Sequence, residues 1–343
     1  MGRLRMADWI QMPEREFAHE VEKLEKDPLF QKLYFGDGRI PGAVRRQRWP
    51  GGKLSGSFYE IDERTATGAG ERVGVEEFAQ ERGPALAAIK RMGQKDFERY
   101  FLHGEDSLTL EEIGRRTNLT PQEVRTIHDL VVELGARAEF EGKVVAPTAA
   151  PGRQAACLAK ISMTGGTPTF EFFAPYWARG LYQIRFDLLE KWKAGGLNPE
   201  ERRHLPALLK RLETVNLRQS TLFRLLETVA RLQTDYLQNE RLEDVRPISL
   251  RQLAKRLDLA PSTVSRAFSR RSVRLPSDRE LPLIAFVPGR RSVLRELLGQ
   301  WLAQDGDVTD AALAARLKAD RGISISRRTV NAVRHELKAV KPR

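Results

Sequence analysis

The chain has 343 residues, of which 41% are hydrophobic and 30% charged, and its formal net charge is +12. At roughly 100 to 200 residues per domain, this length predicts two or three domains with cores of their own and excludes a single small disulfide-stapled module. The sequence has no apolar run long enough to span a membrane, no apolar centre in its first residues that would suit a signal peptide, and one cysteine, Cys157. We therefore expect a cytoplasmic protein that has neither disulfides nor a membrane contact.

The N-terminal part starts with a helical pattern and continues into a polar stretch. Apolar residues at mixed spacings over residues 7–35 predict a short helical segment that Pro28 interrupts. Residues 36–74 mix glycine, proline and charge without an apolar period, so we expect a linker or a loosely ordered loop there.

A helix-turn-helix pattern occurs twice, with the second copy 140 residues after the first. The helical residues 75–134 end in the first copy, and residues 248–270 form the second. Five apolar slots match: Leu110, Ile113, Leu119, Val124 and Ile127 in the first copy, and Leu250, Leu253, Leu259, Val264 and Ala267 in the second. Pro121 and Pro261 both stand at the first turn of the second helix, where proline is favoured. Two tri-helical units of one design are predicted.

Two further elements lie between these copies. β-Branched and aromatic residues flank Gly165-Gly166 within residues 155–175, which predicts a small β-hairpin. Residues 199–238 repeat apolar residues at helical spacing, with one gap at Arg218-Gln219, and predict long amphipathic helices. The predicted fold class is therefore mainly α and multi-domain.

The positive charge is concentrated towards the C-terminus. Residues 247–343 hold 20 Lys and Arg against 9 Asp and Glu, which gives them +11 of the net +12. A third helix-turn-helix pattern lies there, in which Thr309 and Ser326 are expected to cap the two helices and Gly322 to end the first. Because Lys and Arg neutralise phosphates and release counterions, this part is expected to bind a polyanion.

The second and third units carry the residues expected to contact double-stranded DNA. In a helix-turn-helix, the second helix enters the major groove, and flanking charges hold phosphates. In the second unit the predicted contacts are Ser262, Thr263, Ser265 and Arg266, with Arg270, Arg271 and Arg274 as phosphate anchors. In the third unit they are Arg327, Arg328, Thr329, Asn331 and Arg334, since arginine can read guanine and asparagine adenine. Two such units suggest two half-sites.

The remaining polar residues indicate neither DNA binding nor catalysis. The second helix of the first unit presents Gln122, Glu123, Asp129 and Glu133, which would repel phosphate. We therefore interpret residues 108–134 as a structural or protein-binding unit. The five histidines lie far apart without a second ligand at metal-binding spacing. A helix start explains the acids Asp305, Asp307 and Asp310. We expect no catalytic residue, metal or cofactor.

Two alternatives remain open from the residues themselves. One is a free-standing helix-turn-helix regulator that needs no polymerase and uses the helices at 199–238 as its dimer interface. The other is a DNA-processing enzyme such as a recombinase, which needs acidic metal ligands or a nucleophile near the basic domain.

Several stretches resemble the sigma-54 (sigma-N) factors of bacterial RNA polymerase. Residues 247–286 are similar to the family's central helix-turn-helix, and residues 208–237 are similar to its core-binding helices. Residues 326–335, SRRTVNAVRH, resemble the box that reads the upstream GG promoter element. Residues 7–33 resemble the second half of the family's activator-responsive region, whose Gln-rich first half is missing or much shortened. The box departs from the family's Lys, Tyr and Glu at three positions, which implies an altered promoter preference or affinity: Ala332, Val333 and His335.

The resemblance implies a division of the chain and a function. The implied parts are a region I-like segment at 1–35, a linker at 36–74, a core RNA polymerase-binding domain at 75–245, a central DNA-binding domain at 246–300 and a promoter-box domain at 301–343. The implied function is transcription initiation by a nucleoid-associated factor. This factor binds core RNA polymerase and directs it to GG/GC-type promoters with an ATP-dependent enhancer-binding activator. The implied polymerase-binding residues are Leu208, Leu212, Leu222, Leu225 and Val229, and the implied activator-responsive residues are Trp9, Met12, Phe17 and Leu24.

Overall fold

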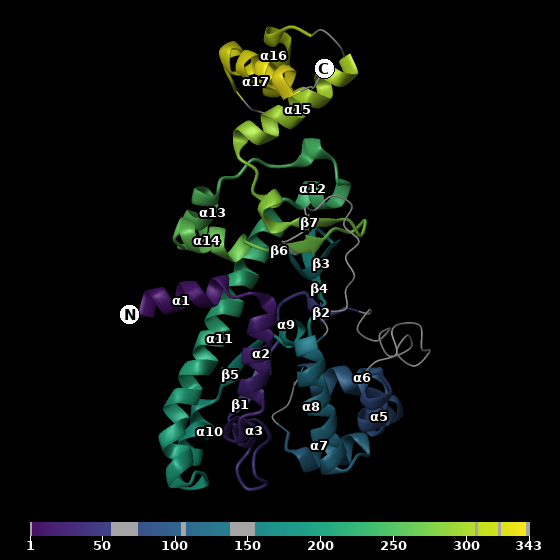
Figure 1. Cartoon of the computed structure of the whole chain (residues 1–343), viewed down its shortest axis with the longest axis vertical. Coiled ribbons are helices and arrows are strands. Elements are labelled where there is room, and N and C mark those ends of the chain that lie inside the picture. Colours follow the sequence, from purple (N-terminus) through teal and green to yellow (C-terminus); the bar gives the residue numbers. More distant parts are fainter. Residues whose placement is uncertain are drawn as a thin grey trace.

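The computed structural model describes residues 2–55, 75–103, 108–137, 155–305, 308–321 and 324–340, and these are mainly helical, as predicted (Figure 1). The N-terminal pattern forms the helices α1 (Gly2–Gln11), α2 (Glu14–Glu25) and α3 (Pro28–Phe35). The Asp27 side chain accepts hydrogen bonds from the backbone N of Leu29 and Phe30, at 2.9 and 3.3 Å. Pro28 follows this cap as the first residue of α3, a position where its missing N–H is not needed.

The first helix-turn-helix unit lies in a helical group of its own. This group contains α5 (Val75–Met92), α6 (Gln94–Phe97), the π-helical turn η1 (Glu98–His103), α7 (Leu110–Thr117) and α8 (Pro121–Arg137). The Thr109 side chain accepts from the backbone of Glu112 and the Glu112 side chain accepts from the backbone of Thr109, so a capping box starts α7. Asn118 ends it in the left-handed conformation with φ of 57°, which turns the chain sharply into α8.

The predicted β-hairpin is confirmed and belongs to a larger sheet. Strands β3 (Ala156–Thr164) and β4 (Thr167–Phe172) pair antiparallel around Gly165 and Gly166, whose positive φ values of 56° and 77° suit a tight hairpin turn. The sheet has the strand order β2-β4-β3-β6-β7, where β2 is Gly52–Leu54, β6 is Arg271–Arg274 and β7 is Glu280–Pro282. Segments from three distant parts of the chain therefore share one sheet.

The predicted linker is in part a folded segment. Strand β1 (Val44–Gln47) pairs antiparallel with β5 (Leu181–Ile184), and β2 pairs parallel with β4. Ala43 and Val44 are buried in the core. Both strands are completed by partners more than a hundred residues away, so the local composition, which is rich in Gly and Pro, carries no sign of the pairing. Residues 56–74 lie outside the described residues.

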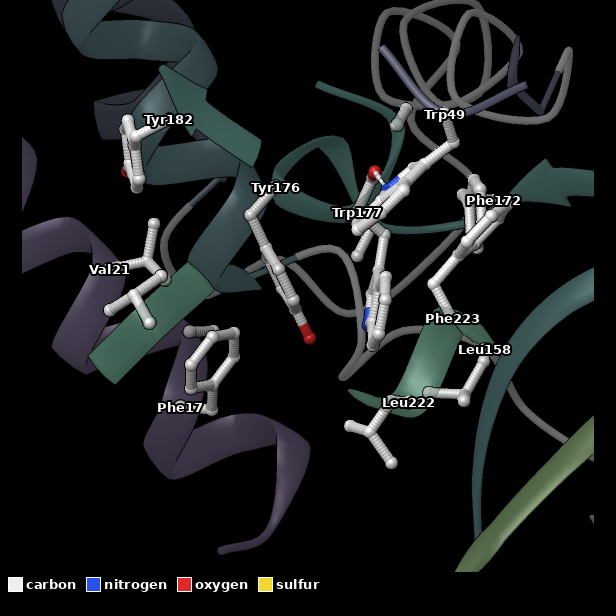
Figure 2. Packing of buried hydrophobic residues seen from close by; sticks show 14 of the residues in the cluster. Phe17, Val21, Trp49, Leu158, Phe172, Tyr176, Trp177, Tyr182, Leu222 and Phe223 are labelled. Carbon is white, nitrogen blue, oxygen red and sulfur yellow. Dashed lines mark hydrogen bonds between the residues drawn. The ribbon is translucent and has the colours of Figure 1, made fainter. Parts of the chain in front are cut away.

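One long helix organises the centre of the molecule. It is α11 (Pro199–Leu232), which follows α9 (Pro175–Ala178), α10 (Phe186–Lys191) and the π-helical turn η2 (Trp192–Gly196), and it is followed by α12 (Thr234–Asn239) and the 3-10 turn η3 (Leu242–Asp244). A capping box between Asn198 and Glu201 starts α11. The inner face of α11 packs on an aromatic cluster in which Phe223 stacks on Trp49, with ring centroids 4.2 Å apart (Figure 2). This packing supplies most of the helix's stability.

The described residues form two hydrophobic cores. The larger core runs from Ile10 to Val287 and includes α13 (Leu250–Leu257), α14 (Pro261–Phe268) and the 3-10 turn η4 (Leu283–Phe286). The smaller core, from Val293 to Val333, joins three helices at the end of the chain (Figure 1): α15 (Arg290–Asp305), α16 (Asp310–Arg321) and α17 (Arg327–Val340). The expected boundary at residue 245 thus lies within one continuous core, and that at residue 300 lies inside α15.

Candidate nucleic-acid interface

The second helix-turn-helix unit is built by local signals in its sequence. The hydroxyl of Ser249 accepts a hydrogen bond from the backbone N of Gln252 at 3.2 Å, and the Gln252 side chain accepts from the backbone N of Ser249 at 2.8 Å. This capping box starts α13. Asp258 ends the helix in the left-handed conformation, with φ of 55°. Val264 and Ala267 on α14 are fully buried, so the opposite side of α14 faces outward, as predicted.

The outward side of α14 carries small polar groups and is flanked by positive charge. Ser262, Ser265 and Arg270 are exposed, whereas Thr263 and Arg266 are half-buried. α13 adds three exposed basic side chains, which are Arg251, Lys255 and Arg256. Arg274 is half-buried, with its guanidinium 4.9 Å from the ring centroid of Phe173. Short side chains allow a close approach of the helix to base edges, and the flanking charges suit phosphates.

Arg271 departs from its expected role as a phosphate anchor. Its side chain is only 2% exposed. It donates to the Glu14 carboxylate at 2.6 Å and to the carbonyl oxygens of Ile10 and Ala267 at 3.1 and 2.8 Å. The guanidinium thus has its donors turned inward, away from solvent and from DNA. The sequence alone does not show which of the neighbouring arginines Arg270, Arg271 and Arg274 pairs with a buried carboxylate.

The third unit presents the other predicted contacts. The Ser326 hydroxyl accepts from the backbone N of Thr329 at 3.2 Å, and Thr309 caps α16 by accepting from Ala312 at 3.3 Å. α16 extends to Arg321, and Gly322, the residue expected to end it, lies outside the described residues. On α17, four of the predicted DNA contacts are exposed: Arg327, Arg328, Thr329 and Asn331.

Arg334 is the fifth predicted contact on α17 and is held within the unit. Its Nη1 lies 3.0 Å from Oδ1 of Asp310, and its Nη2 donates to the carbonyl of Val308. The Asn331 side chain also donates to Asp310, at 2.9 Å. Asp310 therefore ties α16 to α17, a role beyond the helix-start explanation that its position suggests. In this arrangement Arg327 and Arg328 are the freer basic groups at the start of α17.

A hollow of about 650 Å³ beside α17 adds two arginines that the sequence analysis missed. It is lined by side chains of α15 and α17, among them Arg290, Arg291 and Arg328, and by the hydroxyls of Ser326 and Thr329. Arg290 donates to the carbonyl of Ser324 at 2.6 Å, and Arg291 pairs with Glu336. The signal was an Arg-Arg pair at the first turn of α15, which the expected domain boundary at residue 300 separated from the promoter-box segment.

Comparison with known proteins gives a match where the second unit lies. Residues 201–286, which span α11 to η4, match the family model described as "Sigma-54, DNA binding domain". The resemblance to the sigma-54 factors is thereby confirmed for these residues. The match concerns a DNA-binding domain and includes the whole of the second helix-turn-helix unit.

A solved structure is also similar to this chain. It is the crystal structure of Aquifex aeolicus sigmaN bound to promoter DNA, with 17% sequence identity and a TM-score of 0.39, and the similarity covers 81% of this chain and 96% of that one. None of the curated proteins matches. None of the described helices has the length and apolarity of a membrane span, and three or more His, Cys, Asp or Glu do not gather into a metal site within the described ranges.

The residues implied for the sigma-54 polymerase contact lie in the interior of this chain. Leu208, Leu212, Leu222, Leu225 and Val229 are each at most 3% exposed. They form the inner face of α11, which packs on the N-terminal helices and on the sheet. The expectation that they face a partner is corrected: their apolar period reflects the core of this protein. For the same reason they are not available as the dimer interface of a free-standing regulator.

The activator-responsive segment of the sigma-54 resemblance is docked on the body of the protein. Phe17 and Leu24 on α2 are fully buried, and Trp9 and Met12 are half-buried. Helix α1 packs against both α11 and α14. The gap that interrupts the apolar period of α11 is explained here, because Arg218 and Gln219 are completely buried and hydrogen-bonded to N-terminal and α9 groups. Periodicity of apolar residues cannot reveal such a polar contact.

Proposed function

We propose that the chain is a sigma-54-type initiation factor that binds duplex promoter DNA through α14 and α17 and brings core RNA polymerase to it. The observation that carries this proposal is the family match over residues 201–286, which contains α14 with its exposed serines and basic flank. A comparable exposed helix start on α17 supports a second contact. Two DNA-recognition helices on one chain are consistent with a promoter that has two separate elements.

The proposal gives separate roles to the residues of the two units. Arg327 and Arg328 read guanines of the upstream element, with Thr329, Asn331 and Arg334 beside them. Ser262, Thr263, Ser265 and Arg266 lie at the downstream element. Arg290 and Arg291 in the hollow beside α17 hold backbone phosphate, which Arg270 also does next to α14.

The test of DNA reading is a base-by-base binding measurement. Arg328→Ala in the full chain should weaken binding to a GG/GC-type promoter duplex by about 5- to 150-fold. This loss should appear only on duplexes that contain the guanine read by Arg328. Lys318→Ala, an exposed basic residue on α16, is the matched control. An equal loss on every sequence, or no loss, would contradict base reading by Arg328.

Polymerase binding is assigned to the exposed surface of residues 75–245. Phe186 and Leu217, which are 67% and 49% exposed, are large apolar side chains on that surface. Leu217→Asp and Phe186→Asp should each reduce capture of purified core polymerase and leave DNA binding and the unfolding midpoint unchanged. If core polymerase does not bind the wild-type chain while sequence-specific DNA binding persists, the chain is a free-standing regulator instead. The proposal also includes an ATP-dependent activator, which remodels the closed complex of polymerase and promoter.

A further inference from the structure

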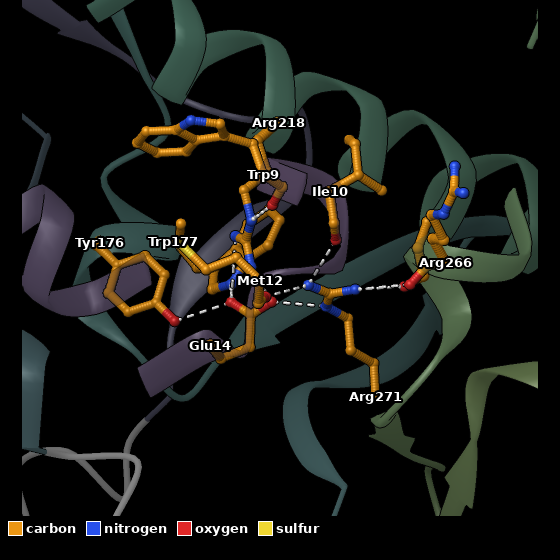
Figure 3. A network of polar contacts seen from close by, with 10 residues as sticks. Trp9, Ile10, Met12, Glu14, Tyr176, Trp177, Arg218, Arg266 and Arg271 are labelled. Atoms are coloured by element: carbon orange, nitrogen blue, oxygen red, sulfur yellow. Dashed lines mark hydrogen bonds and ion pairs between the residues drawn. The ribbon is translucent and has the colours of Figure 1, made fainter. Parts of the chain in front are cut away.

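A buried carboxylate connects the N-terminal segment to the recognition helix of the second unit. Glu14, the first residue of α2, is 3% exposed and lies between the guanidinium groups of Arg218 on α11 and Arg271 on β6 (Figure 3). Its Oε1 atom accepts from Nη2 of Arg218 at 2.7 Å and from Nε of Arg271 at 2.6 Å. Tyr176 and Trp177 donate to the same carboxylate at 3.0 and 3.1 Å. Four donors from three elements thus converge on one acid.

Arg271 extends this contact to α14. Its Nη1 donates to the carbonyl oxygens of Ala267 and Arg266, at 2.8 and 3.3 Å. These carbonyls belong to the last turn of α14, where a helix leaves its acceptors unsatisfied and where positive charge is favourable. The Nη2 of Arg271 donates to the carbonyl oxygens of Ile10 and Met12, at 3.1 and 3.0 Å. Arg271 therefore holds the end of α14 and the N-terminal chain at once.

Arg218 fixes the other side of the carboxylate. It donates to the carbonyls of Trp9 and Met12 at 2.9 and 3.0 Å, and its guanidinium lies 3.7 Å from the ring centroid of Phe17. Burial alone would raise the pKa of Glu14, but the charges and hydrogen bonds of Arg218 and Arg271 outweigh it and lower that pKa to about 2. The carboxylate is therefore ionised at neutral pH and separates two buried like charges.

We propose that Glu14 is a positioning residue for DNA recognition, which sets the orientation of α14 through Arg271. The inference rests on the proposed function, since it concerns how α14 meets DNA. Without the carboxylate, the two arginines repel each other, and the end of α14 loses its fixed donor. Ser262 and Ser265 lie on the same short helix, so a change in its direction moves them against the base edges. A small displacement is enough to lose a hydrogen bond to a base.

The opposite end of α2 supplies a matched control. Glu25 is 1% exposed, and it also lies between two buried arginines, Arg46 and Arg179, with Tyr182 donating to it at 2.7 Å. Its pKa is likewise lowered to about 2. None of these partners touches α14. Glu14→Gln and Glu25→Gln therefore remove the same charge from the same helix, in equally buried sites, and only Glu14→Gln acts on the recognition helix.

The experiment measures binding of the full chain to a promoter duplex and to single-base-pair variants of it. The double variant Ser262→Ala with Ser265→Ala assigns the positions read by α14, and Arg328→Ala assigns those read by α17. Glu14→Gln should lose at least 10-fold of its discrimination at the α14 positions and retain it at the α17 positions, while Glu25→Gln retains both. Arg271→Lys keeps the charge beside Glu14 but cannot span to the carbonyls of α14, so it should reproduce the Glu14→Gln profile.

Four results would overturn the inference. If Glu14→Gln and Glu25→Gln discriminate between base pairs to the same extent at every position, Glu14 contributes only to general stability. A wild-type profile for a folded Arg271→Lys would remove the route to α14. A wild-type chain that does not discriminate between base pairs would overturn the proposed function as well, whereas normal wild-type discrimination that Glu14→Gln retains overturns the positioning role alone.

Discussion

The α7–α8 unit and the α13–α14 unit are built alike and surrounded differently. In both, the first helix starts with a capping box and ends in a left-handed residue, Asn118 or Asp258, and proline opens the second helix. However, α8 continues to Arg137 and packs on α2, α5 and α9, whereas α14 ends at Phe268. Both helices keep an exposed side in their first two turns. Local signals thus determine the construction, the neighbouring elements determine how much of each second helix is buried, and the charge at the exposed start distinguishes the two units.

The starts of the two second helices show the same difference in charge. Glu123 accepts from the backbone N of Thr120 at 2.7 Å and pairs with Arg91 at 2.5 Å. These bonds to Thr120 and Arg91 lower the pKa of Glu123 to about 2, so a carboxylate stands at the start of α8. The equivalent positions before and within α14 are Ala260 and Thr263, which bring no charge. A phosphate is repelled at the first site and tolerated at the second.

The largest effect on stability is expected at Glu25, which holds Arg179 next to His128 of the first unit. Glu25→Ala leaves Arg46 and Arg179 buried without their acid, so the free energy of unfolding should fall by about 3–5 kcal/mol. Amide exchange should rise more in α8 than in α14, because His128 of α8 lies 3.5 Å from Arg179. Chemical denaturation and hydrogen exchange test this. Glu190→Ala, which breaks an exposed pair with Lys193, should cost under about 1 kcal/mol.

Acid should weaken both anchors of α2. The pKa values of Glu14 and Glu25 are about 2 in the folded chain, below the ordinary value of 4.5. The stabilisation by these carboxylates is therefore complete above about pH 4.5 and is lost as the pH falls from there to about 2. Over this pH range, protonation of each carboxylate should lower the free energy of unfolding by about 3 kcal/mol. Glu25→Gln should flatten the acid limb of the stability curve, and an unchanged limb would contradict these pKa values.

The comparison can be inverted by moving one carboxylate. Thr263→Glu gives α14 the residue that Glu123 provides at the start of α8. DNA affinity should fall by about 10- to 100-fold because the new charge faces phosphate, while the unfolding midpoint changes little. Thr263→Gln is the neutral control and should bind within a few-fold of the wild type. Undiminished binding by Thr263→Glu would mean that the start of α14 does not face DNA.

A smaller effect is expected where the two units differ by one methyl group. A Cβ at Gly114 would lie 2.4 Å from the carbonyl oxygen of Leu119, whereas Ala254 occupies the same slot in the second unit. Gly114→Ala should destabilise the chain by about 1–2 kcal/mol, although alanine favours helices by about 1 kcal/mol over glycine. Thermal unfolding measures the balance. A stabilised variant would show that the first corner relaxes to the geometry of the second.

The smallest effect concerns a single exposed charge in each unit. Arg270→Ala should reduce the slope of log affinity against log salt concentration by about 1, since one phosphate contact is lost. Arg115→Ala, an exposed charge on α7 of the first unit, should leave that slope unchanged. Titrations at several salt concentrations distinguish the two. Equal slopes for both variants would remove the functional distinction between the units.

The sequence predicts what local chemistry decides. The caps at Thr309 and Ser326, the proline at Pro261 and the glycine pair of the hairpin place helices and turns within a few residues of their observed positions. The exposed side of α14 also follows from its short apolar pattern. Contacts between distant segments were not predictable in this way: β1 and β2 depend on strands far along the chain.

Buried polar groups explain the remaining errors. Arg271 and Arg218 belong to residue types that are rarely buried, so their place in the core follows only from the position of Glu14. The same argument applies to the apolar stripe of α11. An amphipathic helix buries its apolar face against some surface, and the pattern does not say whether that surface belongs to the same chain or to a partner.

The contact between Glu14 and Arg271 also sets an order of events during synthesis. The two residues are separated by 257 positions, so a ribosome that adds 5 to 20 residues per second needs roughly 13 to 51 seconds between them. Throughout that interval the nascent N-terminal helices lack the guanidinium that finally holds Glu14. The segment that contains Glu14 is thus held in place late, although it is made early, and the Glu14–Arg271 contact forms only after the recognition helix has been synthesised.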